Sequence, residues 1–366
     1  MAKKKSSKTP ADLPGHSDSL RQFHKTARGK IFHGDSLLLF DKKVRPESVD
    51  LIVTSPPFGL VRKKQYGNVD AHEYLEWFKP FGEAFKKALK PNGSLVIDIG
   101  GAWISGQPTR SLYHYELLIM LCKECGFHLA QDFFWWNPSK LPSPAEWVTV
   151  RRIRVKDAMN CIWWLSPTPW PKASNRRVQV PYSESMKGLL KNGYKGNVVR
   201  PSGHDISEKF SRDNGAAIPP NLIAVPNTES NSHYMRYCKE NELPPHPARF
   251  PSAIPEYFIR MLTDENDLVI DPFAGSCITG EVCERLNRNW MCCDLVEDYL
   301  TGAMGRFENP EQDENQKLLF ARGNGKTAST YKTYHPGVLW DNLEEEALPQ
   351  DGGIERKIEK KKPPKK

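Results

Sequence analysis

Short apolar runs alternate with longer amphipathic stretches along most of the chain. The short runs are bounded by Gly, Pro, Asn and Asp, and this pattern predicts buried strands. Between them, apolar residues recur at helical spacing, which predicts crossover helices and a mostly parallel α/β sheet. We expect strands at residues 30–33, 48–53, 94–99, 128–136, 158–165, 267–270 and 290–293, and helices at residues 72–89, 112–125, 255–262, 278–286 and 298–307.

Residues 137–245 break this alternation. They are rich in Pro, Asn, Ser and basic residues and carry little periodicity. A stretch of roughly 100 residues is too long for a connecting loop, so we expect a second, smaller domain inserted into the first. Within it, residues 158–165 keep a strand pattern and are expected to join the main sheet. The main domain then consists of residues 29–136 and 246–340.

Basic residues are distributed unevenly. The formal net charge is +8, of which residues 1–30 and 351–366 contribute +6 and +4. Residues 151–215 alone hold 13 basic and 5 acidic residues. Such a segment is typical of polyanion binding, although a solvated basic surface explains it equally well. The Lys-rich ends, residues 1–28 and 341–366, lack apolar periodicity and are expected to be disordered basic tails.

Several classes of protein are disfavoured by the sequence. No apolar run approaches the length of a membrane span, and no apolar stretch follows the Lys-rich start as a secretory signal requires. The eight cysteines show no disulfide framework. Cys122 and Cys125 form one C-x-x-C, but no second pair completes a zinc site. We therefore expect free thiols in a reducing cytoplasm, no bound metal and no membrane partner.

The loop that begins at Asp271 has the sequence Asp-Pro-Phe-Ala-Gly-Ser and follows a predicted parallel strand, where ligands usually bind. Gly275 permits a tight turn, and Ser276 opens a helix whose free N–H groups suit an anionic ligand. Asp294, about 20 residues on, has the spacing of an acidic group that binds ribose hydroxyls. The absence of G-x-G-x-x-G favours a small cofactor with a methionine moiety. By itself, the loop is equally well explained as an ordinary strand-to-helix turn.

The loop Ser55-Pro56-Pro57-Phe58 is more specific. The exocyclic amine of a nucleobase is a poor nucleophile, because its lone pair is delocalised into the ring. The Ser55 hydroxyl and the Pro56 carbonyl supply two acceptors for the amine protons, and consecutive prolines stiffen the loop. Phe58 offers a flat face on which an extruded base can stack. The alternative is a proline-stiffened strand exit without catalytic function.

A third predicted strand ends at the same edge of the sheet, at Asp98, and is followed by Gly100. Asp98 is a candidate for positioning the amine or the cofactor, or for capping the next loop, and the sequence leaves these alternatives open. Together, the loops predict a methyltransferase that transfers a methyl group from S-adenosylmethionine to an amino group of a nucleic-acid base.

At these residues the chain resembles the β class of amino-methylating DNA methyltransferases, in which the target-amine motif precedes the cofactor motif. A serine before Pro-Pro is similar to the cytosine-N4 branch, whereas adenine-N6 enzymes usually carry Asp or Asn there. The resemblance is strongest to the PvuII-type modification methyltransferases and covers roughly residues 29–310. It is carried by residues 54–60, 62–64, 137–144, 200–206, 218–222 and 246–251.

The resemblance implies a fold and a cofactor site. The fold is a Rossmann-like class I methyltransferase sheet, circularly permuted and mostly parallel with one antiparallel strand, plus a smaller target-recognition domain. The permutation break falls between the strand that ends at Asp294 and the strand that ends at Asp35. Asp35 would contact the adenine of S-adenosylmethionine, and residues 246–251 would lie under its methionine end. The other implied or candidate cofactor residues are Asp98, Gly100, Pro247, Asp271, Phe273, Gly275, Ser276 and Asp294.

One departure from the family pattern lies in the cofactor loop. The family usually continues Gly-Ser-Gly-Thr-Thr, whereas this chain has Cys277 at the third position. A side chain is thereby added where the backbone approaches the ligand, which we expect to affect cofactor affinity rather than the location of the pocket.

Recognition of double-stranded DNA falls to the basic insert. Basic side chains would hold phosphates and a few polar groups would contact base edges. His204 is expected either to contact DNA or to stabilise its own loop, and the sequence does not decide between these two roles. The candidate DNA-binding residues are Lys140, Arg151, Arg154, Lys156, Arg200, Ser202 and His204.

The expected function is therefore cytosine-N4 methylation at a specific DNA site, such as the palindrome CAGCTG suggested by the resemblance. A restriction endonuclease would be its functional rather than physical partner. We expect a monomer in the cytoplasm, associated with the nucleoid. Adenine-N6 methylation, or a catalytically inactive DNA-binding relative of the same fold, remains open. A C5-cytosine enzyme is disfavoured, because the chain contains no Pro-Cys dipeptide.

Overall fold

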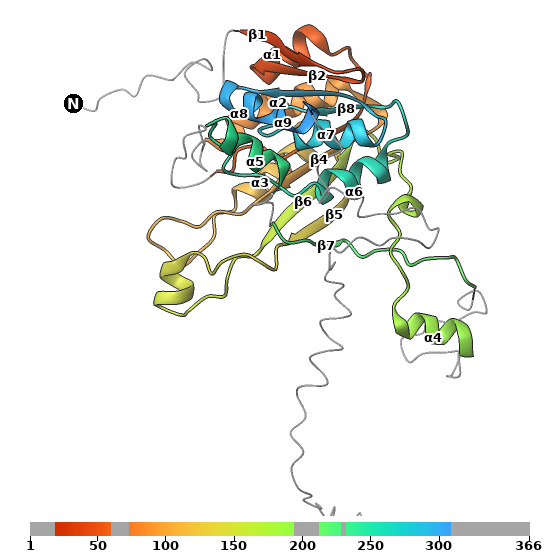
Figure 1. Ribbon diagram of the computed structural model, residues 1–366. Helices are drawn as coiled ribbons and strands as arrows, with labels where there is room; N and C mark the ends of the chain where they lie inside the picture. Colours follow the sequence, from red (N-terminus) through yellow and green to blue (C-terminus); the bar gives the residue numbers. More distant parts are fainter. Residues whose placement is uncertain (1–18, 60–72, 194–211, 228–231, 309–366) are drawn as a thin grey trace, which may run out of the picture. The chain divides into compact units, whose positions relative to one another are not determined.

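The computed structural model describes residues 19–59, 73–193, 212–227 and 232–308. A single sheet crosses this part of the chain in the order β1-β2-β9-β8-β3-β4-β6-β5-β7 (Figure 1). Its strands are β1 (Leu20–Lys25), β2 (Gly29–Gly34), β3 (Val49–Thr54), β4 (Leu89–Ile99), β5 (His128–Trp136), β6 (Met159–Ser166), β7 (Leu222–Ala224), β8 (Leu268–Asp271) and β9 (Asn289–Asp294).

Helices connect most of these strands. The α-helices are α1 (Ser36–Lys43), α2 (Tyr74–Ala88), α3 (Tyr113–Lys123), α4 (Glu184–Asn192), α5 (His233–Glu240), α6 (Ala253–Leu262), α7 (Ile278–Arg285), α8 (Glu297–Ala303) and α9 (Gly305–Glu308). A π-helical turn, η2 (Glu146–Val150), and a 3₁₀ turn, η3 (Asn175–Val178), lie in the insert.

The strand directions confirm the mostly parallel α/β fold. β2, β9, β8, β3 and β4 run parallel to one another, and β6 runs antiparallel to both β4 and β5. β6 is thus the antiparallel strand that the resemblance implies, and β1 is a second one at the edge of the sheet. β9, late in the chain, lies between the early strand β2 and β8, as the circular permutation requires.

The expectation that residues 1–28 form a disordered tail is wrong for Leu20–Lys25, which form β1. An edge strand pairs through its backbone with one neighbour, so its side chains need little apolar alternation to hold it. Phe23 packs against the core, and Arg21 pairs with Glu297 at 2.5 Å between Nη2 and Oε1. The segment is otherwise polar and basic, so the hydrophobic pattern of the sequence does not predict this strand.

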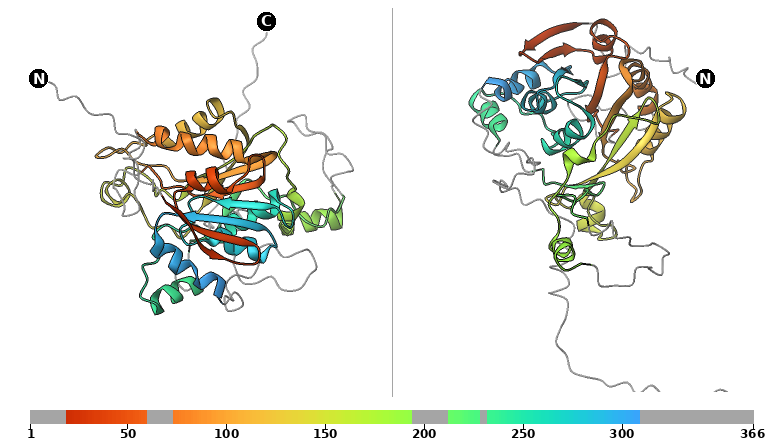
Figure 2. Two further views of the ribbon diagram at one scale, coloured as in Figure 1. Left: turned by 90° about the horizontal axis from the view of Figure 1, so that it is seen from above. Right: turned by 90° about the vertical axis from the view of Figure 1, so that its right-hand side faces the viewer.

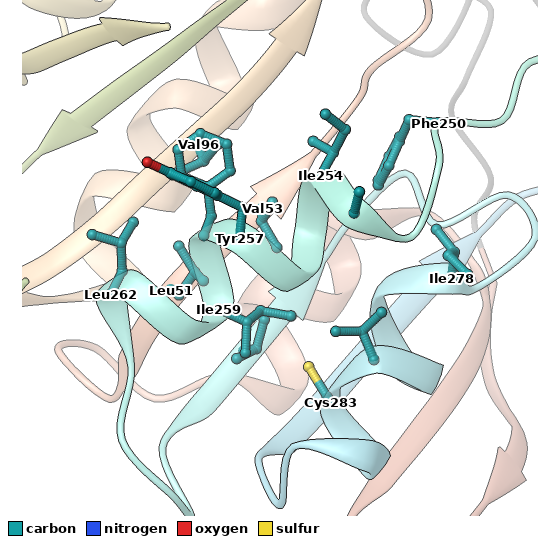
Figure 3. Close-up of a cluster of buried hydrophobic side chains, with 14 of the residues drawn as sticks. Leu51, Val53, Val96, Phe250, Ile254, Tyr257, Ile259, Leu262, Ile278 and Cys283 are labelled. Carbon is teal, nitrogen blue, oxygen red and sulfur yellow. The ribbon is translucent and has the colours of Figure 1, made fainter. Parts of the chain in front are cut away.

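Helices cover both faces of the sheet. α1, α2 and α3 contribute to the apolar cluster on one face, and α6 and α7 contribute to the cluster on the other (Figure 2). Successive strand side chains point to opposite faces. Leu51 and Val53 of β3 accordingly pack against the α6 side (Figure 3), whereas Ile52 packs against the α2 side. β3 is therefore buried on both faces, as its continuous apolar run predicts.

The insert at residues 137–245 is only partly separate from the sheet. It supplies β6 and β7, and its Val178 and Ile223 belong to the cluster that includes α6. By contrast, α4 has no buried residue and extends away from the sheet (Figures 1 and 2). Among the described helices, none is both long and apolar enough to span a membrane.

Candidate active site at the switch point of the sheet

The connections reverse direction between β8 and β3. From β8 the chain passes through α7 to β9 on one side, and from β3 it passes through α2 to β4 on the other. Ligands of open α/β sheets bind outside the carboxyl ends of the strands at such a point. A cavity of about 480 Å³ lies there, within the usual size range of small-molecule sites. Its wall combines the loops after β3, β4, β8 and β9, the start of β6, and residues 246–250.

The two loops singled out in the sequence are joined directly. Thr54 Oγ1 donates a hydrogen bond of 2.6 Å to Asp271 Oδ1, across 217 positions of sequence. Asp271 Oδ2 accepts a second bond of 2.6 Å from Thr279 Oγ1, and Oδ1 also accepts from the Phe273 N–H. Burial raises the pKa of Asp271 to about 6 against the lowering effect of these bonds. Asp271 is thus occupied by protein donors and lies behind the cavity wall, while Phe273 lines it.

Ser55 and Asp98 face the cavity as a hydrogen-bonded pair. The Ser55 hydroxyl donates to Asp98 Oδ2 at 3.2 Å. Asn160, at the start of β6, donates through Nδ2 to Asp98 Oδ1 at 3.0 Å. All three side chains line the cavity. Burial raises the pKa of Asp98 to about 7, although the bonds from Asn160 and Ser55 lower it.

The rest of the Ser-Pro-Pro-Phe loop also lines the cavity. Pro56, Pro57 and Phe58 all contribute to its wall. The Phe58 ring lies against Gly100, where a Cβ atom would come within 2.6 Å of Cε2. Only glycine leaves room for the ring at this position. Phe58 is therefore packed against the chain just after β4, and it contributes to the cavity wall.

Asp294 forms another polar part of the wall. Its Oδ2 accepts a hydrogen bond of 2.7 Å from the Gly275 N–H, and its Oδ1 accepts one of 2.9 Å from the Val296 N–H. Burial raises the pKa of this half-buried carboxyl. Gly275 has φ +49°, and an added Cβ would lie 3.0 Å from the His246 ring, which itself lines the cavity. Gly275 thus connects the loop after β8 both to Asp294, through a hydrogen bond, and to residues 246–250, through its contact with His246.

Besides Asp271, three candidate cofactor-binding residues do not line the cavity. The Asp35 side chain caps α1 by accepting from the Leu37 N–H at 2.8 Å, and its neighbour Ser36 lines the cavity instead. Ser276 is buried and accepts from the Arg306 guanidinium through both Oγ and its carbonyl. Gly275 lies behind His246. Of the candidate cofactor residues, the wall therefore includes Asp98, Gly100, Pro247, Phe273 and Asp294, and leaves out Asp35, Asp271, Gly275 and Ser276.

Cys277 adopts the left-handed conformation, with φ 52° and ψ 33°, at the start of α7. Its side chain is buried and hydrogen-bonded to Cys292, and it does not line the cavity. The cysteine that replaces the family's glycine therefore adds backbone strain of about 1 kcal/mol, but it places no atom in the pocket wall.

The candidate DNA-binding residues separate into two groups. Lys140 lines the cavity, and Arg151, Arg154 and Lys156 are exposed just beyond it on the same segment. Arg151 also pairs with Glu146, and Arg154 donates to the Pro108 carbonyl. Arg200, Ser202 and His204 lie outside the described residues, as do residues 62–64.

Trp103 and Asn160 also line the cavity, although the sequence singled out neither of them. Ser36 adjoins Asp35, and His246 begins the run 246–251 that the resemblance places under the methionine end of the cofactor; both line the wall. Asn160 carries no motif, and only the pairing of β6 with β4 brings it to Asp98. Within the described ranges, no group of three or more His, Cys, Asp or Glu residues is placed to hold a metal ion.

The donor set of the cavity fits S-adenosylmethionine. The Asp294 carboxylate borders the cavity, as the expected contact with ribose hydroxyls requires, and Phe273, Leu295 and Val296 provide an apolar wall nearby. Ser55 and Asp98 lie in the wall of the same cavity, where a methyl acceptor can meet the cofactor. This fold and site define a class I, S-adenosylmethionine-dependent methyltransferase.

Comparison with known proteins gives the family. The N6/N4 methyltransferase family, described as DNA methylase, matches residues 49–305. The chain is 50% identical to the type II methyltransferase M.PvuII of Proteus hauseri over 284 residues, 77% of this chain and 84% of the relative. It is 27% identical to M.BglII of Bacillus subtilis over 84% of this chain and 76% of the relative. The chain belongs to the N6/N4 DNA methylase family.

A solved structure agrees with this assignment. The structure of PvuII DNA methyltransferase, described as cytosine-N4-specific, superposes with a TM-score of 0.64 at 43% identity. The match covers 79% of this chain and 90% of that one. The permuted sheet is thus shared with a DNA methyltransferase of known structure.

Proposed function

We propose that this chain methylates the N4 amino group of cytosine at a specific site in double-stranded DNA. The observation that carries the proposal is the Ser55–Asp98 pair in the wall of the cavity. The identity of 50% to M.PvuII supports the choice of cytosine and makes CAGCTG the first site to test. As in a restriction–modification pair, the modification would protect DNA from an endonuclease of the same specificity.

Ser55 binds the target amine. Because the Ser55 hydroxyl donates to Asp98, its oxygen lone pairs remain available to accept a hydrogen bond from the amine. The Pro56 carbonyl provides the second acceptor. Two acceptors on the amine protons favour a tetrahedral nitrogen and free its lone pair for attack. The part of the Phe58 ring that Gly100 leaves open is available to stack on the extruded base.

Asp98 completes the proton path. When bound, S-adenosylmethionine supplies the electrophilic methyl group, and the methylated amine then carries a proton that must leave. Ser55 Oγ takes this proton while its own proton passes to Asp98 Oδ2. A carboxyl with a pKa of about 7 suits this task, because it is partly ionised at neutral pH and readily protonated afterwards.

The insert would hold the DNA around this site. Lys140 lines the cavity, Lys156 donates to its carbonyl, and Arg151 and Arg154 are exposed on the same segment, so that these side chains can meet backbone phosphates. Arg200, Ser202 and His204 remain proposed contacts to DNA. We further propose that the chain acts as a monomer on cytoplasmic, nucleoid-associated DNA.

The test is direct analysis of the product. Purified protein is incubated with duplex DNA and S-adenosylmethionine, the DNA is digested to nucleosides, and methylated nucleosides are separated by mass spectrometry. We expect N4-methylcytosine, confined to CAGCTG in duplexes that carry the site or single-base variants of it. N6-methyladenine as the product would contradict the proposal. Cofactor binding without any methylated nucleoside would instead identify an inactive DNA-binding relative.

A further inference from the structure

Large apolar side chains are exposed beside the cavity mouth. Leu141 is 79% exposed and Val155 is 87% exposed. Both belong to the segment 140–156, which runs out from the cavity wall and returns to it. Exposed side chains of this size are common singly, but here Val150 and Ile153 are also exposed within the same stretch, and Met159 is exposed just after it.

These two residues are close in sequence to wall residues of the cavity. Leu141 lies between the wall residues Lys140 and Ser143, and Val155 precedes the wall residue Asp157 by two positions. The two arms of the segment are tied together by a bond of 3.0 Å from the Asp157 N–H to the Ser143 carbonyl. Lys156 Nζ also donates to the Lys140 carbonyl at 3.3 Å.

The backbone behind these side chains is well supported. Pro142 and Pro144 restrict the arm that carries Leu141. On the other arm, the Ile153 N–H donates to the Trp147 carbonyl at 2.9 Å, and Arg154 Nε donates to the Pro108 carbonyl at 3.1 Å. An exposed apolar side chain on an ordered backbone can insert into a binding partner without the entropic cost of ordering a flexible loop.

The charge around the two side chains identifies the partner. Residues 140–156 hold five basic residues, Lys140, Arg151, Arg152, Arg154 and Lys156, and one acidic residue, Glu146. A polyanion is attracted to such a segment, whereas a lipid or protein core would have to desolvate its arginines. The base stack of duplex DNA offers both a flanking row of phosphates and an apolar interior.

We propose that Leu141 and Val155 form a wedge that enters the DNA duplex and fills the space left by the extruded target base. The proposal rests on the proposed function, because the cavity must accept a base taken from a duplex. Extrusion breaks pairing and stacking, and apolar side chains inserted between base steps offset that loss in other proteins that distort DNA. The wedge would stabilise the open duplex while the adjacent cavity holds the base.

The test compares matched and mismatched DNA. Wild type and the double variant Leu141→Ala/Val155→Ala are assayed on a duplex that carries CAGCTG and on the same duplex with a mismatch opposite the target base. A mismatched base is already partly unstacked, so it needs less help from the wedge. We expect single-turnover methylation of the matched duplex to fall about tenfold, in line with the apolar groups removed, and of the mismatched duplex to stay within about twofold of wild type.

A second measurement reports extrusion itself. With 2-aminopurine in place of the target base, wild-type binding should raise its fluorescence, and the double variant should raise it less. The matched control is Val150→Ala, which removes a similarly exposed side chain on η2 and should behave as wild type in both assays.

The outcomes separate the wedge from the proposed function. Equal loss on matched and mismatched duplexes, or wild-type rates for the double variant, would overturn the wedge and leave the methyltransferase function intact. A wild-type protein that methylates neither duplex would contradict the proposed function. The fluorescence comparison of wild type with double variant would then still decide whether these residues open DNA.

Discussion

Asp98 and Asp271 end the two strands that flank β3, and both are buried carboxyls with a raised pKa. Their surroundings nevertheless differ. Asp271 accepts from two threonine hydroxyls and a backbone N–H and lies behind the cavity wall. Asp98 accepts from Ser55 and Asn160, and all three line the cavity. One carboxyl therefore fastens the loops together, whereas the other is available to a ligand.

The difference teaches that burial and a raised pKa alone do not distinguish a structural carboxyl from a catalytic one. What distinguishes them is whether the group borders the cavity, which Asp98 does and Asp271 does not. Asp271 makes the site by joining Thr54 to the cofactor loop. In the proposed mechanism, Asp98 acts within the site through Ser55, which donates to it. Substitutions at the two positions should therefore have opposite consequences.

The largest effect is expected for Asp98→Ala. Loss of the proton acceptor should lower kcat by about 10²- to 10⁴-fold, the usual contribution of a general base. Unfolding free energy should change by less than about 1 kcal/mol, because water in the cavity can replace the bonds to Ser55 and Asn160. Single-turnover kinetics and urea unfolding measure the two quantities. A variant that unfolds far more easily than wild type would show that Asp98 is structural after all.

Ser55→Ala should follow, with kcat reduced about 10²-fold through loss of one hydrogen-bond acceptor for the amine. Cofactor affinity should stay near the wild-type value, because Asp294 and the β8 loop are untouched. Titration calorimetry with S-adenosylmethionine and a methyl-transfer assay test this separation. Unchanged turnover would remove the hydroxyl from the mechanism.

Asp271→Ala should reverse the pattern seen at Asp98. The Thr54 and Thr279 hydroxyls and the Phe273 N–H would lose a buried acceptor, and unfolding free energy should fall by about 1–3 kcal/mol or more. Urea unfolding measures it against Asp264→Ala, an exposed carboxyl on the loop before the same strand. Stability equal to that of the control would mean that these groups find other partners.

Asp294→Ala should have a smaller effect, confined to the cofactor. Loss of the acceptor for ribose hydroxyls, and of the bond that holds the Gly275 N–H, should raise the Kd for S-adenosylmethionine about tenfold. The measurement is calorimetry on protein without DNA. An unaltered dissociation constant would refute the placement of the ribose at Asp294.

The smallest effect concerns the pH dependence of Asn160→Ala. Asp98 must be ionised to accept a proton, so wild-type kcat should rise with pH through about 7. Asn160 donates to Asp98 and favours its charged form, so its removal should move this rise to higher pH, by about one pH unit. Asn92→Ala, at the opposite end of β4, is the control. Equal loss of activity at every pH would indicate a purely structural role.

The sequence by itself determined where strands β2–β6, β8 and β9 and helices α2, α3, α6 and α7 lie, and which residues end the central strands, but it did not predict β7, α1, α4 or α5. Apolar runs fix where strands lie, and parallel strands bring their carboxyl ends to one edge. Ser55, Asp98, Phe273 and Asp294 could therefore be assigned to one site before any coordinates. By the same reasoning β1 was missed, because an edge strand needs so little apolar pattern.

Only the tertiary structure decided how each polar group is used. Whether a carboxyl at a strand end faces a cavity or fastens a loop depends on donors from other strands, such as Thr54 for Asp271 and Asn160 for Asp98. These donors lie far away in sequence and carry no motif. Local pattern specifies the backbone path, whereas the hydrogen-bond partners of a buried charge are set by packing between segments that meet only in the folded chain.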